Sequence, residues 1–189
     1  MTPTPVPVRE DDPAIDAAAV LAEWQRQGEA VARTMTQPGV ARPEQVAGKT
    51  GLQVFEMMFA GEIPYPPIAQ TLDFLLVETG PGRAVFQGRP LQRHYNPLGS
   101  VHGGWFATLL DSAVGCAVHT TLDAGRGYTT AELKINITRP LTDRVPLVRA
   151  VGQVIHVGRR MATAEARMVG PDGRLYAHAS TTCFLFDAA

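Results

Sequence analysis

The sequence predicts an α+β fold in which an antiparallel sheet curls around one long central helix. From residue 68 onward, two segments with strand patterns come first, then one long apolar helix, then four more strand patterns. Turns rich in Pro and Gly separate these segments. Because one helix cannot cover both faces of a six-stranded sheet, we expect the sheet to wrap around that helix.

The chain before the sheet is predicted to be an N-terminal extension, residues 1–60, followed by a main domain over residues 61–189. Residues 1–13 are expected to be loose, because four prolines in this short segment prevent a helix. Apolar residues at helical spacing then predict an extra helix over 14–35 and a second one over 52–61.

The second predicted helix runs into the segment Ile63-Pro64-Tyr65-Pro66-Pro67, which is predicted to be non-helical. The helix is rich in Met and Phe, which suits either ordinary core packing or the entrance to a pocket for an apolar ligand. The helix and the Pro-rich loop together suggest a lid over an acyl chain or an aromatic ring.

The strands of the main domain are predicted from runs of β-branched and aromatic residues bounded by turns. The first two strands, 68–78 and 83–89, flank a Gly-Pro-Gly turn, and the long helix is expected over 101–121. The four later strands are predicted over 128–138, 145–157, 161–169 and 174–186.

Strict alternation in the strand 128–138 predicts which of its residues share a face. One face is expected to carry Ala131, Leu133, Ile135 and Ile137. The other face is expected to carry Thr130, Glu132, Lys134 and Asn136.

Composition and charge exclude several classes of partner. The formal net charge is -1, so nothing points to nucleic acid or to an anionic membrane surface. No apolar run approaches the ~20 residues needed to span a bilayer. The two cysteines, Cys116 and Cys183, lie in apolar runs without a CxxC neighbour, and the histidines have no metal-ligand spacing. We therefore expect a cytoplasmic protein without a metal site.

The most informative stretch runs from Asn96 to Asp111. A turn rich in Pro and Gly leads into Gly103 and Gly104, which open the long helix. Backbone N–H groups at a helix start can bind a negative oxygen. The same helix carries Asp111 among apolar residues, where an ionised carboxylate is costly unless it is used or paired. These two features favour acyl transfer chemistry, although a buried Asp that merely holds a loop by hydrogen bonds is the alternative.

The spacing along this helix predicts an assembly. Asp111 lies seven residues beyond Gly104, which corresponds to roughly 10 Å along the axis. A base and an oxyanion donor must both lie within about 3 Å of the reacting atoms. One copy of the helix cannot easily supply both groups, whereas two antiparallel copies can. We therefore predict a homodimer with two shared sites, and a dimer of dimers remains open.

Residues 96–104 and the following Leu109-Leu110-Asp111 resemble the signature of hot-dog fold acyl-CoA thioesterases of the PaaI-like group. Segments 127–133, 136–140 and 158–160 agree with this resemblance, which covers about residues 68–186. It implies the hot-dog fold and a hydrolase that converts acyl-CoA to a free acid and CoA. No cofactor is implied, since CoA is part of the substrate.

The resemblance also implies catalytic roles. Asp111 corresponds to the catalytic acid, acting as a general base for water or as a nucleophile on the thioester carbon. The Gly103 amide corresponds to the oxyanion donor, with Gly104 giving room for the substrate. Asn96 corresponds to a residue that helps to hold the water or the carbonyl. Thr130 corresponds to a Ser or Thr that helps to position the water.

Further substrate contacts are expected at the remaining motif positions. His102 corresponds to the motif histidine, which we expect to fix the turn beside the substrate. Arg139, Arg159 and Arg160 are candidates for contacts with the phosphates of CoA, or they are bystanders on the surface.

Two other functions remain open from the sequence. A hot-dog dehydratase or hydratase would need a histidine paired with an acid, and His102 is the only candidate in the motif. A protein that binds acyl-CoA without turning it over is the other alternative, and an intact Asp111 argues against it.

Overall fold

The computed structural model describes residues 15–187, so the predicted loose segment 1–13 lies outside the described residues. Helices α1 to α4 come first, followed by β1 and β2, a short 3₁₀ helix η1, the long helix α5 and then β3 to β6. The helices are α1 (Ala17–Thr34), α2 (Pro43–Val46), α3 (Gly51–Phe59), α4 (Pro67–Thr71), η1 (Gln92–His94) and α5 (Gly103–His119). The strands are β1 (Phe74–Gly80), β2 (Arg83–Gly88), β3 (Arg126–Ile137), β4 (Val148–Val157), β5 (Met161–Val169) and β6 (Leu175–Asp187).

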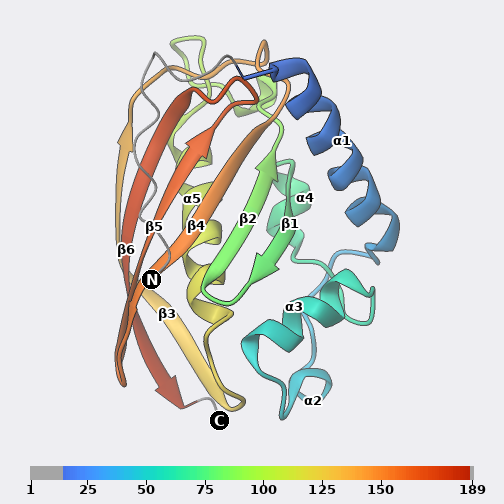
Figure 1. Cartoon of the computed structure of the whole chain (residues 1–189), viewed down its shortest axis with the longest axis vertical. Coiled ribbons are helices and arrows are strands. Elements are labelled where there is room, and N and C mark those ends of the chain that lie inside the picture. Colours follow the sequence, from blue (N-terminus) through green and yellow to red (C-terminus); the bar gives the residue numbers. More distant parts are fainter. Residues whose placement is uncertain (1–14, 188–189) are drawn as a thin grey trace.

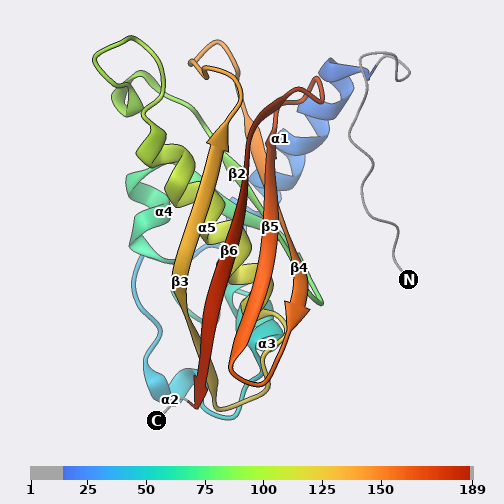
Figure 2. The same cartoon turned by 90° about the vertical axis from the view of Figure 1, so that its left-hand side faces the viewer.

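The strands in residues 15–187 form one six-stranded antiparallel sheet with the order β1-β2-β4-β5-β6-β3. The sheet curls around α5, and β3 forms one of its edges (Figures 1 and 2). This arrangement confirms the predicted α+β hot-dog fold with an additional N-terminal helix.

Helix α5 supplies much of the core. Its sheet-facing residues are fully or almost fully buried: Phe106, Leu109, Leu110, Ala113 and Ala117. Strand β4 passes so close to the helix that a Cβ on Gly152 would lie 2.2 Å from the carbonyl oxygen of Ala113. Only glycine fits at this crossing, so the close packing of helix and sheet depends on it.

The predicted strand over 68–78 is wrong in its first half, because Pro67–Thr71 forms α4 and β1 begins at Phe74. The predicted non-helical segment 63–67 is wrong at Pro67, which is the first residue of α4. Proline is well suited to the first position of a helix, where its missing N–H is not needed. The short helix α2, which also begins with a proline, was not predicted from the sequence.

A β-bulge interrupts the alternation of β3. Thr130 pairs with Cys183 of β6, and Glu132 pairs with the preceding residue, Thr182. Ala131 is therefore an extra residue on the bulged strand.

The bulge corrects the predicted faces of β3. Thr130 lies on the same face as Leu133 and Ile135, toward α5, because the extra residue shifts the alternation by one. Ala131, which was predicted to share the face of Leu133, is exposed instead. Without the bulge, the hydroxyl of Thr130 would point away from Asp111.

Helix α1 lies outside the curled sheet, on the side of β1 and β2 (Figure 1). It covers Arg149, which is only 7% exposed and whose guanidinium carbon lies 4.7 Å from the ring centroid of Trp24. The Nε and Nη2 groups of Arg149 donate to Oε1 of Gln87 at 3.1 and 3.0 Å. Burial lowers the pKa of Arg149 to about 10, so the side chain stays charged at neutral pH. This stack anchors α1 on the sheet, while the division of the chain at residue 60 stays a prediction.

Candidate active site

Asp111 is held by the hydroxyl of Thr130. Helix α5 places the carboxylate opposite β3, and Thr130 Oγ1 donates to Asp111 Oδ1 at 3.0 Å. Asp111 is partly exposed, and within residues 15–187 its other oxygen, Oδ2, has no hydrogen bond or ion pair. One oxygen is therefore oriented, while the other is free to accept a proton or attack a carbonyl carbon.

The N-terminus of α5 provides one free backbone donor. His102 is the N-cap residue, and its Nδ1 accepts a hydrogen bond from the N–H of Gly104 at 2.8 Å. In the described part of the chain, the N–H of Gly103 has no such partner. The position that a Cβ on Gly103 would take lies 3.5 Å from Cδ1 of Ile137. Of the two glycines, Gly103 is thus the one whose amide is available to a ligand, and His102 fixes the helix start as expected.

Asn96 stabilises the turn before α5. Its Oδ1 accepts from the N–H groups of Leu98 and Ser100 at 2.8 and 3.3 Å, and its Nδ2 donates to Ser100 Oγ at 3.2 Å. These contacts hold the loop that presents the helix start. A direct contact between Asn96 and a substrate stays a prediction.

The two candidate catalytic groups are far apart within one chain. Gly103 and Asp111 lie on the same continuous helix, eight residues apart, which corresponds to about 12 Å along its axis. One chain therefore does not bring the free N–H and the carboxylate to the same carbonyl group.

The three candidate arginines lie at opposite ends of β3. Arg139 lies two residues beyond the end of the strand, whereas Arg159 lies near its start, where the backbone oxygen of Arg159 accepts from Arg126 Nη2 at 2.7 Å. Arg160 is next to Arg159, and all three candidates are exposed. A strand of 12 residues spans about 36 to 41 Å. One chain does not bring these three side chains to a single phosphate.

Several residues beside Asp111 were missed in the sequence analysis. A Cβ on Gly115 would lie only 2.8 Å from Tyr128 Oη. The absence of a side chain at Gly115 therefore lets Tyr128 pack directly against α5, near the carboxylate of Asp111. A glycine in the middle of an apolar helix is the signal that indicates such a close approach. Cys116 lies one position further, and burial raises the pKa of its thiol to about 12, so it stays protonated.

A small cavity lies on the same stretch of α5. It has a volume of about 90 Å³ and is enclosed by α3, α4, β1, β2 and α5. Ser112 and Cys116 form the part of its wall that comes from α5. Ser112 directly follows Asp111 in the sequence.

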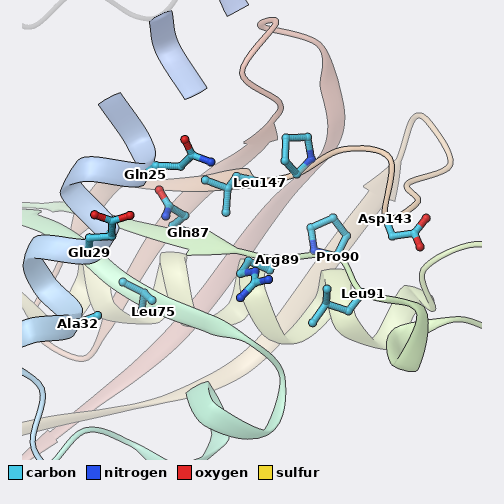
Figure 3. Close-up of a pocket in the computed structure, with 12 residues that line it drawn as sticks. Gln25, Glu29, Ala32, Leu75, Gln87, Arg89, Pro90, Leu91, Asp143 and Leu147 are labelled. Carbon is cyan, nitrogen blue, oxygen red and sulfur yellow. The ribbon is translucent and has the colours of Figure 1, made fainter. Parts of the chain in front are cut away.

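A larger cavity of about 480 Å³ lies between α1 and the outer face of the sheet (Figure 3). Gln25, Glu29 and Ala32 of α1 form one side of it, and Leu75 and Gln87 lie on the strands below. None of the predicted site residues lines this cavity. It is therefore separate from the candidate active site.

Two further observations concern the described residues only. None of their helices is both long and apolar enough to span a membrane. Among the same residues, no group of three or more His, Cys, Asp or Glu side chains is arranged to hold a metal ion.

Comparison with known proteins agrees with this geometry. The family model of the thioesterase superfamily matches residues 98–177, the segment that contains α5 and the strands β3, β4 and β5. No curated protein matches the chain.

Solved structures give the same result. A phenylacetic acid degradation-related protein from Ralstonia eutropha is 28% identical, with a TM-score of 0.63, and the match covers 69% of this chain and 98% of that one. The phenylacetic acid degradation protein PaaI from Thermus thermophilus is 28% identical, with a TM-score of 0.56, covering 62% and 97%. A thioesterase family protein from Silicibacter pomeroyi is 25% identical, with a TM-score of 0.60, covering 65% and 90%. The predicted resemblance to hot-dog thioesterases of the PaaI-like group is confirmed.

Proposed function

We propose that this protein hydrolyses the thioester of an acyl-CoA to a free acid and CoA, at two sites shared across a homodimer. The observation that carries the proposal is the carboxylate of Asp111, held by Thr130, on the same helix that opens with the free N–H of Gly103. The similarity to the thioesterase superfamily supports the reaction class.

The proposed reaction uses the carboxylate as a general base. The thioester carbonyl oxygen accepts a hydrogen bond from the N–H of Gly103 of the partner subunit. Asp111 Oδ2 takes a proton from a water molecule, whose oxygen attacks the carbonyl carbon. Negative charge collects on the carbonyl oxygen, where the N–H stabilises it. The C–S bond then breaks, and the CoA sulfur receives the proton from Asp111. Direct attack by the carboxylate is the nucleophilic version of the same step.

The placement of β3 supports the shared site. β3 is an edge strand, and Thr130 near its start lies beside Asp111, while Ile137 at its end lies beside Gly103. If β3 pairs antiparallel with β3 of a second copy, the start of one strand lies beside the end of the other, on both sides of a two-fold axis. Gly103 of one subunit is then brought toward Asp111 of the other.

The charges of β3 favour one register for this pairing. Residues directly opposite each other in antiparallel strands point to the same face of the sheet. In a two-fold pair of identical strands, this requires the axis to lie at a residue that is opposite its own copy, and not midway between two neighbouring residues. An axis at Leu133 places Glu132 opposite Lys134 of the partner subunit, twice. An axis at Lys134 would place two lysines opposite each other, which is unfavourable. Both Glu132 and Lys134 are exposed and, among the described residues, neither forms a salt bridge. We therefore place the axis at Leu133.

The test is thiol release from a panel of acyl-CoA thioesters. Asp111→Asn keeps the shape of the side chain but removes the base, so we expect hydrolysis to fall by at least a factor of about 10². The matched control is Asp123→Asn, which changes an exposed acid after the C-terminus of α5 and should leave the rate unchanged. Hydrolysis that survives Asp111→Asn would refute the assigned role. Binding of acyl-CoA without any thiol release would identify a binding protein instead.

A further inference from the structure

We infer that the acyl group of the substrate occupies the small cavity beside Asp111, and that the cavity selects short aliphatic acyl groups of about five or six carbons over aromatic and long-chain groups. This inference rests on the proposed thioester hydrolysis and adds the class of acyl group.

The position of the cavity links it to the reacting carbonyl. Ser112 lines the cavity and directly follows Asp111, and Cys116 lines it one helical turn further along. Pro66 and Ile68 are exposed lining residues, so the cavity has an open side next to α4. A thioester carbonyl held next to Asp111 therefore has an apolar recess within reach of its acyl chain.

The walls of the cavity come largely from the N-terminal part of the chain. Phe55 and Met58 of α3, Tyr65 of the Pro-rich loop and Ala69 of α4 face Phe86 of β2 across it. Phe55, Tyr65, Ala69 and Phe86 are all buried, whereas Met58 is only partly buried. These residues belong to the segments that the sequence suggested as a lid over the acyl group, and that role stays a prediction.

The polar groups around the cavity are already occupied. Ser112 Oγ donates to the carbonyl oxygen of Thr108 at 2.8 Å, and Tyr65 Oη accepts from the N–H of Leu76. Burial keeps the thiol of Cys116 protonated, because it raises the pKa to about 12. An apolar acyl chain loses no hydrogen bond on entering such a recess, whereas a hydroxylated or charged one does.

The size of the cavity sets the length of the chain. A cavity of about 150 Å³ lined by apolar residues takes up benzene, with its six carbons. The cavity beside Asp111 measures about 90 Å³, which by proportion holds about three or four carbons. Adding the carbonyl carbon and about one carbon on the path gives an acyl group of about five or six carbons. A phenyl ring is too large unless a wall moves.

The experiment measures kcat/KM for thioesters from acetyl-CoA to decanoyl-CoA and for phenylacetyl-CoA. Each methylene that enters the cavity should raise kcat/KM about fourfold. We expect a maximum at about five or six carbons, with lower values for phenylacetyl-CoA and decanoyl-CoA. The same series of S-alkyl-CoA thioethers, which cannot be hydrolysed, gives the binding preference by calorimetry.

Two variants change the cavity in opposite directions. Ala69→Val fills part of it, so we expect kcat/KM for hexanoyl-CoA to fall about tenfold relative to that for acetyl-CoA. Met58→Ala enlarges it, so phenylacetyl-CoA should gain at least about tenfold relative to butanoyl-CoA. Ala32→Val makes the same change as the first variant at the larger cavity under α1 and should leave the profile unaltered.

The outcomes separate this inference from the proposed function. A flat profile, a wild-type preference for phenylacetyl or decanoyl groups, or a profile that neither variant shifts would overturn the inference while hydrolysis stands. If no thioester is hydrolysed, the proposed reaction fails, and the thioether series still tests whether the cavity binds short chains. If Ala69→Val does not fold, Met58→Ala carries the test alone.

Discussion

The proposed shared active site makes a quantitative prediction for mixed dimers. Gly103→Pro removes the free N–H and puts the ring carbon Cδ in its place, and proline is well tolerated at the first position of a helix. The preceding residue, His102, already has the extended backbone that a following proline requires, with φ -63° and ψ 139°. Loss of one oxyanion donor costs about 10² to 10³ in rate. Gly103→Pro and Asp111→Asn should therefore each be nearly inactive alone.

Mixing the two inactive variants should restore activity. In a mixed dimer, one site combines Asp111→Asn with Gly103→Pro, and the other combines an intact Asp111 with an intact Gly103. Random exchange makes about half of the dimers mixed, and one of their two sites is intact, so about a quarter of wild-type activity should return.

The assay is thiol release after the two variants are unfolded together and refolded at a 1:1 ratio. Refolding each variant alone is the control, and circular dichroism checks that both fold. If the base and the donor belonged to the same chain, every chain in the mixture would carry one defect. No activity would then return, and the reasoning about the shared site would be refuted.

Four further predictions concern the base, the interface, the core and the pH dependence of stability. Thr130→Val removes the hydrogen bond to the carboxylate of Asp111, the proposed base. We expect kcat to fall about ten- to a hundredfold, the value of a hydrogen bond to a charged group. An unchanged kcat would show that the hydroxyl does not orient this carboxylate for the reaction. Lys134→Glu should weaken the dimer about tenfold in sedimentation experiments, because it places like charges opposite each other across the interface. Adding Glu132→Lys to this variant should restore the dimer, because opposite charges then face each other again. A double variant that does not regain the dimer would exclude the proposed register. Gly152→Ala should lower the free energy of unfolding by about 1 to 3 kcal/mol or more in a urea titration, because its Cβ would lie 2.2 Å from a carbonyl oxygen of α5. An unchanged urea midpoint would mean that β4 and α5 move apart without cost. Burial lowers the pKa of His119 from its ordinary value of 6.5, so protonation favours the unfolded state as the pH falls below that value. The Tm of the wild-type protein should therefore decline from pH 7 to pH 5, and the Tm of His119→Phe should decline less. An equal decline in both proteins would show that His119 is not responsible.

The sequence predicted the sheet, the long helix and the helix start because these depend on local patterns. Turn residues bound the strands, and the glycine pair marks the start of α5 where the structure has it. The role of Asp111 stays a prediction, which came from one charged residue in an apolar helix and from the resemblance to the thioesterases. Each of these signals lies within a few neighbouring residues.

The remaining features depend on contacts that no local pattern contains. The bulge at Ala131 is defined by pairing with β6, so alternation alone placed Thr130 on the wrong face. Pro67 begins a helix because α4 can pack against β1, whereas its sequence also allows an extended loop. The cavity beside Asp111 requires α3, α4 and α5 to meet in space. Such features follow from tertiary packing, which overrides local preference.

The extra residue in β3 constrains how this protein can change over evolution. Deleting Ala131 would exchange the interior and the exterior of the first part of the strand, turning Tyr128 and Thr130 to the solvent. A single deletion at that point would therefore remove both the packing of Tyr128 and the hydrogen bond that orients Asp111. A single substitution along the strand leaves the faces of its other residues unchanged, whereas a change in the number of residues at the bulge does not.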